Sequence, residues 1–337
     1  GTSTFTNETG GIFNVNVTDT FSDIAGTGTF SNAGTLNKTS AGITDINTIF
    51  NNTGTVNINN ASGTLEFGRG GTDTGDYVVT LGTLSFDSGG TFSTRNLNSG
   101  SSITGAGAMN VSNFSYTVNF NAGSDYNLTD GLTISDGVVN YSTGTITNLT
   151  NLNLTGGTLQ GSDDLNVTSA FTFGGSTSDA ILRGSGTLTT NAGVTTTLAT
   201  NATSGPDAYL NDTRAWSNFG TVNWVTTINN GLILNGTSTF TNETGGVFNV
   251  NVTDSFSDIA GTGTFNNAGT LNKTTAGDTD ITVTFTNTGT VKVNNASGEL
   301  TLTKFTTNNG IIDVTSGVMD IDGTSFSNAI GATIQGS

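Results

Sequence analysis

Cysteine and histidine are missing from all 337 residues of the chain, and proline occurs once. These absences exclude a disulfide framework, a thiolate or imidazole metal site, and a thiol or imidazole as a catalytic group. Charged residues make up only 10% of the chain, against about 25% in ordinary soluble domains. The surface must therefore be polar without being ionic, and asparagine, threonine, serine and glycine supply that polarity.

The few charges that are present are mostly negative. Acidic residues number 25 and basic residues 8, which gives a formal net charge of −17. A field of this sign repels nucleic acid and anionic membrane surfaces. No apolar run reaches the ~18 residues that a membrane-spanning helix needs. We therefore expect neither a nucleic-acid partner nor membrane insertion within this chain.

Hydrophobic residues are also scarce, at 33%, but the residues that form strands are abundant. The chain has 20 phenylalanines and is rich in valine, isoleucine and threonine. Aromatic and β-branched residues favour strands, and disordered chains lack them. The composition thus predicts a folded, all-β protein.

Repetition occurs at two scales. Residues 1–67 align without a gap on residues 236–302, with 53 of 67 positions identical. The copies diverge after Phe67, where Gly68–Gly71 reads GRGG and the second copy reads TKFT. Such a duplication suits a fragment of a longer repeat array. Residues 68–235 have a similar residue pattern, but their coils are less regular in length. We therefore expect one continuous solenoid over residues 1–337.

The shorter repeat has a period of about 20–25 residues. Its core is an aromatic residue, then asparagine, then glycine, then two apolar residues with one residue between them. FNNTGTVNI at Phe50 is one example. In the clearest coils these three positions are Phe30, Asn32 and Gly34; Phe50, Asn52 and Gly54; Trp216, Asn218 and Gly220; Phe265, Asn267 and Gly269; and Phe285, Asn287 and Gly289.

Each coil alternates polar and apolar residues in short strands separated by turns. Val56 and Ile58 share one strand face, as do Leu65 and Phe67 after the turn at 59–63. Strands this short cannot bury enough apolar surface alone, but stacked coils cover one another. The pattern predicts a parallel β-solenoid, a right-handed β-helix by the usual bias of parallel connections. The repeated asparagines are expected to stack as a hydrogen-bonded ladder.

Two lysines break this pattern. Lys38 and Lys273 occupy the slot that Ile58 and Val293 hold in neighbouring coils. Since a buried unpaired ammonium is costly, we expect the strand to end one residue early there. The ammonium would then reach solvent or a carboxylate such as that of Asp45 or Asp280.

Candidate catalytic carboxylates occur in turn-like segments. Asp163-Asp164 and the series Asp125, Asp130 and Asp136 could in principle serve glycoside hydrolysis. Aspartate is also a routine turn former, and this interpretation suits contexts such as QGSDDLN. We expect no enzyme, no catalytic residue and no cofactor.

Calcium is the one metal that this inventory of oxygen ligands would suit. Asp278-Thr279-Asp280 and Asp320-Ile321-Asp322 carry alternating carboxylates on one face. Neither segment matches an EF-hand loop or the glycine-rich nonapeptide calcium repeat. A solvated surface is therefore the preferred interpretation.

The segment 204–216, with the single proline, is the candidate for an exposed contact surface. Trp216 and Trp224 align with Phe285 and Val293, so core packing is expected for both tryptophans. Tyr209 and Arg214 remain as the expected surface contacts.

Taken together, the FxNxGTVxV and SGTLxF units resemble the giant β-strand-repeat surface proteins of bacteria. These include the filamentous-haemagglutinin-like and autotransporter-passenger-like β-solenoids. The likeness extends to the richness in asparagine, threonine and glycine, the acidity and the lack of cysteine. It covers essentially the whole chain. The resemblance implies secretion to the cell surface, a right-handed parallel β-helix, and a role in adhesion or in surface fibres and sheaths.

Several functions fit this fold. The leading hypothesis is an extracellular structural protein, a stiff fibre, stalk or sheath whose chains associate end to end or laterally. An adhesin that binds a glycan or a neighbouring surface, through residues 68–214, is the alternative. A polysaccharide-degrading β-helix enzyme is more remote. Ice binding through outward threonines is disfavoured, because asparagine and lysine interrupt the threonine ladders.

Overall fold

The computed structural model confirms the all-β class. Its 35 strands pair in parallel, and the chain forms a β-solenoid of about 14 turns. The structure describes residues 3–18, 23–87, 92–175, 178–198, 207–225, 231–253, 257–323 and 326–336. No helix occurs in these ranges, and so none that could span a membrane. The chain divides into two compact units, the first Gly1–Asn153 with Gly157–Asp163 and the second Leu154–Gly156 with Asp164–Ser337.

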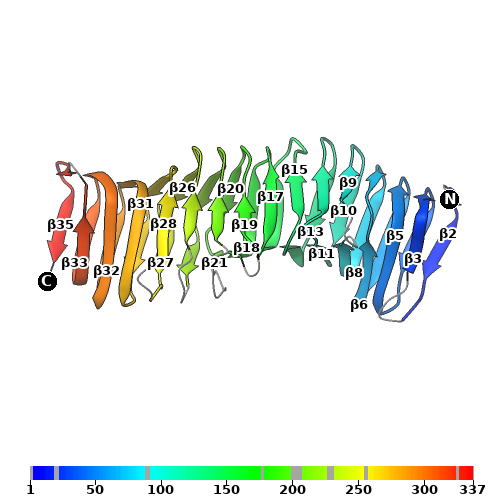
Figure 1. Cartoon of the computed structure of the whole chain (residues 1–337), viewed down its shortest axis with the longest axis horizontal. Coiled ribbons are helices and arrows are strands. Elements are labelled where there is room, and N and C mark those ends of the chain that lie inside the picture. The colour runs from blue at the N-terminus through cyan, green and yellow to red at the C-terminus, as the bar shows by residue number, and fades with distance from the viewer. Residues whose placement is uncertain are drawn as a thin grey trace. The chain divides into compact units, whose positions relative to one another are not determined.

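The first unit contains the strands from β1 to β17, of which the last residue of β16 belongs to the second unit (Figure 1). Their bounds are β1 Thr4–Asn7, β2 Ile12–Val15, β3 Asp23–Asn32, β4 Thr35–Lys38, β5 Gly42–Asn52, β6 Thr55–Phe67, β7 Gly71–Asp73, β8 Asp76–Phe86, β9 Ser93–Leu97, β10 Ser102–Gly105, β11 Ala108–Val111, β12 Tyr116–Phe120, β13 Asp125–Leu128, β14 Gly131–Ile134, β15 Val138–Tyr141, β16 Thr147–Leu154 and β17 Gly157–Gly161.

The second unit contains the strands from β18 to β35. Their bounds are β18 Leu165–Phe173, β19 Ala180–Leu182, β20 Thr187–Thr190, β21 Thr195–Leu198, β22 Ala208–Leu210, β23 Ala215–Asn218, β24 Thr221–Trp224, β25 Leu232–Leu234, β26 Thr239–Asn242, β27 Val247–Val250, β28 Ser257–Gly261, β29 Thr264–Asn267, β30 Thr270–Lys273, β31 Gly277–Asn287, β32 Thr290–Asn308, β33 Ile311–Ile321, β34 Ser327–Asn328 and β35 Thr333–Gly336.

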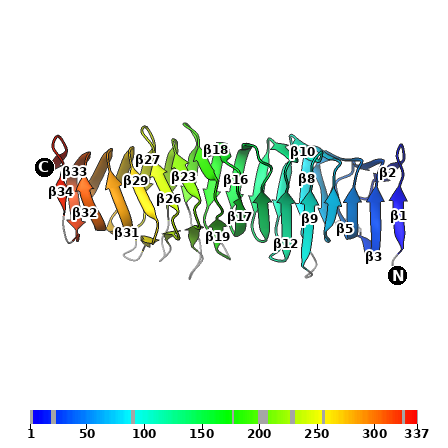
Figure 2. The same cartoon turned by 90° about the horizontal axis from the view of Figure 1, so that it is seen from above.

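Three strands per coil line up with the three strands of the next coil. In the second unit β22 pairs with β25, β23 with β26 and β24 with β27, all in parallel. Figure 2 shows β23, β26 and β29 as neighbours in one such column. Because side chains alternate along each strand, every second residue enters the same narrow core. The predicted alternation is confirmed, since Val56, Ile58, Leu65 and Phe67 are all fully buried.

The repeated aromatic residues stack on one another inside the coils. Phe30 pairs in register with Phe50, and their ring centroids lie 5.1 Å apart. In the second unit Phe265 stacks on Phe285 at 5.3 Å. Edge-to-face contacts at this distance are worth about 0.5–1.5 kcal/mol each beyond the area that they bury. Trp216 and Trp224 are fully buried, as the repeat predicted.

The structure contains the expected asparagine ladder. Each Nδ2 donates to the Oδ1 of the asparagine in the following coil. In the first unit the bonds run from Asn7 to Asn32 at 2.7 Å and from Asn32 to Asn52 at 2.8 Å. In the second unit they join Asn218, Asn242, Asn267, Asn287, Asn308 and Asn328 at 2.7–2.9 Å. The ladder fixes the register of successive coils through buried amides that have both donor and acceptor in use.

Substitution of a central ladder residue is expected to be strongly destabilising. In Asn267→Ala, the donor of Asn242 and the acceptor of Asn287 both lose a buried partner. We expect a loss of about 3 kcal/mol in the free energy of unfolding, measured by urea titration. The control is Asn266→Ala on the outward face of the same strand, where the expected change is about 0.5 kcal/mol or less. Equal losses in both variants would contradict a special role for the ladder.

The prediction for the two anomalous lysines is wrong. β4 and β30 run to Lys38 and Lys273, which pair in register with Ile58 and Val293, so the strands do not end early. Both side chains are fully buried. Lys38 Nζ donates to the carbonyl oxygens of Val17 and Ala41, both at 3.2 Å, and burial lowers its pKa. Backbone carbonyl oxygens thus replace water as the hydrogen-bond acceptors of the Lys38 ammonium.

Candidate functional site

A surface groove in the first unit is the strongest candidate for a binding site. It lies on three successive coils, at Ile49 in β5, at the segment 69–71 before and at the start of β7, and at residues 92–94 at the start of β9. The groove has a volume of about 350 Å³. β5 and β9 are labelled in the blue and cyan part of Figure 1.

The groove exists because a glycine interrupts a column of outward side chains. The strand registers place Gly70 between Ile49 of one coil and Thr94 of the next. A Cβ atom at Gly70 would collide with the carbonyl oxygen of Thr94, so the close approach of these two coils requires glycine here. The missing side chain leaves the hollow.

Two exposed phenylalanines stand at one side of this groove. Phe92 lines the groove and is 89% exposed, and Phe114 of the adjacent coil is 66% exposed. Their ring centroids lie 6.4 Å apart with an interplanar angle of 84°. Most aromatic residues that the structure describes are buried in the core, so two neighbouring rings in solvent are a departure from the pattern.

Arg69 supplies the positive charge. Its half-buried side chain lines the groove and forms no hydrogen bond or ion pair with any residue that the structure describes. The Nε atom is shielded from water and has no acceptor within the described ranges. The backbone is firmly held, because the Arg69 carbonyl accepts bonds from Tyr116 Oη at 2.8 Å and Arg95 Nη2 at 3.3 Å.

A buried polar cluster lies beneath Arg69. Arg95 and Asp73 are both fully buried and form an ion pair at 2.7 Å, with Arg95 Nη1 also donating to Tyr77 Oη at 3.1 Å. The guanidinium carbon of Arg95 lies 4.6 Å from the centroid of the Phe67 ring. Burial, the largest single influence, lowers the pKa of Arg95, but the Asp73 carboxylate together with Tyr77 and Tyr116 holds it well above its usual value. Burial raises the pKa of Tyr77, and the charge of Asp73 adds to this effect.

The duplication shows what this cluster replaced. At an offset of 235 residues, Gly70 corresponds to Phe305 and Asp73 to Asn308. In the second copy Phe305 continues the aromatic stack and Asn308 continues the asparagine ladder. The strand register of the second copy shifts between Phe285 and Asn287, so the residue of the first copy that lies opposite Phe50 is Gly71, and Gly70 faces outward. The Arg95 guanidinium lies beside Gly71 in the place of a stacked ring, and the Asp73 carboxylate stands at the ladder position. The site therefore lies where the two copies diverge.

The two predicted contact residues belong to the second unit, whereas the groove belongs to the first. Arg214 is fully buried, and its Nε donates to the Arg183 carbonyl at 3.0 Å, so its prediction as a surface contact is wrong. Alternation explains the burial, because Arg214 is two residues before Trp216 and shares its inward face. Tyr209 is half-buried in the middle of β22, and its Oη lies 3.4 Å from Asp207 Oδ2.

The paired aspartates accept hydrogen bonds from backbone amides, which agrees with their interpretation as turn residues. Asp163 accepts bonds from the Thr143 amide at 2.6 Å and the Gly144 amide at 3.1 Å. Asp164 accepts a bond from the amide of Thr187 at 2.7 Å. The described ranges contain no group of three acidic residues that could hold a metal ion. Asp278 and Asp280 lie on the outward face of β31.

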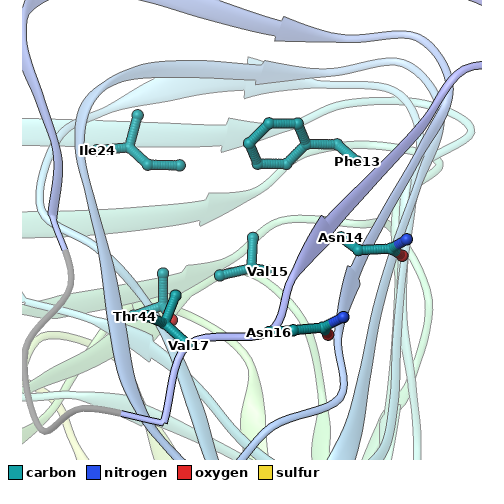
Figure 3. A pocket seen from close by; sticks show the side chains of 7 residues that line it. All are labelled: Phe13, Asn14, Val15, Asn16, Val17, Ile24 and Thr44. Carbon is teal, nitrogen blue, oxygen red and sulfur yellow. The ribbon is translucent and has the colours of Figure 1, made fainter.

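A second hollow, of about 310 Å³, opens at the first coils and is lined by Phe13, Val15, Val17, Ile24 and Thr44 (Figure 3). Its apolar side chains face one another. The corresponding residues of the second copy are Phe248, Val250, Val252, Ile259 and Thr279, and all are buried beneath the preceding coil. The hollow is therefore the inner face of the first coil that the structure describes, and not a ligand pocket.

The groove lies within residues 68–214, the interval in which the sequence predicts the binding face of an adhesin, but the sequence pattern assigns neither Arg69 nor Phe92 to a site. The available signal was an arginine between glycines at the point where one copy departs from the other. Comparison of the chain with protein-family models, curated proteins and solved structures finds no match.

Proposed function

We propose that this chain is an extracellular structural protein, a stiff repeating element of a surface fibre, stalk or sheath. The observation that carries the proposal is the asparagine ladder of the second unit, which runs through six coils without a gap. In stacked repeats each coil contacts only its neighbours, so length can grow by duplication while the cross-section stays the same. The duplication of 67 residues fits this mode of growth. The resemblance to bacterial repeat surface proteins supports a location outside the cell.

Self-association belongs to the same proposal. The hollow at Phe13 exposes the inner face of a coil together with Phe5, which is 50% exposed, and Ile12, which is 68% exposed. In the second copy a coil with Trp216 and Trp224 buries the equivalent face. A preceding coil of this pattern, from the same chain or from a neighbouring molecule, would bury the face in the first unit in the same way, by parallel strand pairing.

Electron microscopy of the full chain tests the structural role. We expect fibres of uniform width, with end-to-end contacts that depend on the inner face. Phe13→Asp places a carboxylate in that face and is expected to shorten or abolish the fibres. Asn14→Asp, on the outward face of the same strand, adds the same charge and should leave fibre length unchanged. Separate particles at all concentrations for the unmodified chain would refute the fibre proposal.

A further inference from the structure

The exposed aromatic pair marks a recognition surface. Phe92 and Phe114 place two rings in solvent within one patch, together with Ile49, which is 43% exposed. An apolar cluster that polar residues surround usually marks an interaction site. Aromatic rings offer flat apolar faces, against which the C–H faces of a sugar ring can stack.

The guanidinium of Arg69 indicates the charge of the ligand. The chain has 25 acidic residues, yet Arg69 pairs with none that the structure describes. By contrast Arg183, on the surface of the second unit, pairs with Asp212 at 3.0 Å. The acidic group of Asp87 is already engaged by Ser112 at 3.2 Å and Asn113 at 3.0 Å. An unpaired guanidinium presents a planar fork of donors that matches a carboxylate.

The groove is formed in advance of binding. Its volume of about 350 Å³ lies within the ~300–1,000 Å³ typical of small-ligand sites. Tyr116 and Arg95 hold the Arg69 backbone from beneath, and Gly70 packs against the Thr94 carbonyl. Little ordering would be required when a ligand enters, which favours affinity from few contacts.

We propose that this groove binds a glycan that carries a carboxylate, with the acid at Arg69 and a sugar ring against Phe92. A nucleic acid does not fit, because the net charge of −17 repels a polyanion and the groove offers one cation. A uronic acid within an otherwise neutral chain presents one carboxylate at a time, together with hydroxyl groups. This inference is independent of the proposed fibre role.

The test is calorimetric titration of the full chain with a hyaluronan tetrasaccharide, in which glucuronate alternates with N-acetylglucosamine. The methyl-esterified tetrasaccharide serves as the neutral ligand. We expect the ester to bind at least about tenfold more weakly, and Arg69→Gln to weaken binding of the acid by the same factor, since hydrogen bonds to charged groups are the stronger ones. Phe92→Ala should weaken binding of both ligands about fivefold.

Two surface variants in the second unit serve as controls. Arg183→Gln removes an exposed arginine, and Phe219→Ala removes a phenylalanine that is 43% exposed. Neither should change the affinity. Equal binding of acid and ester that is unaffected by Arg69→Gln would overturn the proposal, and so would the absence of binding to either ligand. Loss of binding in Arg183→Gln alone would also overturn it, because it would place the site on the second unit.

Discussion

As the pH rises above about 10, the first unit is expected to unfold while the second is still folded. Four of the five tyrosines belong to the first unit, and all four are buried. Burial raises the pKa of each, and the largest effects are at Tyr77 and Tyr141. The second unit contains only Tyr209, which is half-buried.

The sign follows from proton linkage. An unfolded tyrosine loses its proton near pH 10, whereas a buried tyrosine keeps it, so the folded state binds more protons at higher pH. The free energy of unfolding therefore falls as pH rises above that value, by about 1.4 kcal/mol per pH unit for each buried tyrosine. Four such groups give a slope of about 5.5 kcal/mol per pH unit. Below pH ~10 they contribute no pH dependence.

Lys38 has the opposite effect within a limited range. Burial lowers its pKa, so the unfolded state binds the additional proton. Its contribution to stability thus rises with pH until the unfolded lysine also titrates, near pH 10.4. One lysine does not offset four tyrosines above that pH.

The chain provides its own probes for this experiment. Trp216 and Trp224 are the two tryptophans, and both lie in the second unit, so tryptophan fluorescence reports on that unit. Ultraviolet absorbance of tyrosinate reports mainly on the first unit. We expect the absorbance transition to come at lower pH than the fluorescence transition. Coincident transitions would contradict the assignment of the alkaline weakness to the first unit.

A double variant isolates the cause. The hydroxyl groups of Tyr126 and Tyr141 are buried without a hydrogen-bond partner among the described residues, so Tyr126→Phe with Tyr141→Phe removes two ionisable groups and no hydrogen bond. The pH slope of the free energy of unfolding should fall to about half, and the absorbance transition should move to higher pH. At neutral pH the stability should stay equal or rise, because an unpaired buried hydroxyl is unfavourable.

The sequence predicted the parts of the fold that depend on period and repetition. Alternation of period two identified the inward faces, and a repeated asparagine two residues after each aromatic predicted the ladder. The same rule, applied strictly, would have placed Arg214 inside with Trp216 and Asn218. The error came from treating residues 204–216 as one exposed loop, although β23 begins at Ala215 and the residue before it already faces inward.

The candidate site was harder to predict because it depends on contacts between coils. Asp73 and Arg95 are 22 residues apart, which is one turn of the solenoid, but the strict frame ends at Phe67. Where the repeat has no regular period, sequence spacing does not show which position of a coil a residue occupies. The exposure of Phe92 follows from the register between β9 and its neighbours, and composition contains no information on that register.

The buried ion pair should be the most sensitive point in the first unit. Arg95→Ala leaves the Asp73 carboxylate buried without a counter-charge, with the Asn52 amide at 3.0 Å and the Tyr77 hydroxyl as neutral donors. We expect a loss of about 3–5 kcal/mol in the free energy of unfolding, because an uncompensated buried charge is costly. Asp73→Asn alone should cost a similar amount by leaving Arg95 unpaired. The measurement is urea unfolding, with hydrogen exchange to localise the change to the first unit.

The double variant Arg95→Met with Asp73→Asn restores the chemistry of the second copy, where Asn308 continues the ladder. It should be more stable than Arg95→Met or Asp73→Asn alone, and the cycle built from these variants should give a coupling of at least about 2 kcal/mol. The exposed pair Arg183 and Asp212 is the matched control, and its cycle should give no more than ~1 kcal/mol. A double variant that only adds the two single losses would show that the charges act independently.

Arg95 also donates to the Arg69 carbonyl, so the restored core is expected to remain stable while glycan binding weakens. That outcome would separate the two roles of the cluster, since stability depends on the paired charges and the groove depends on the arginine itself.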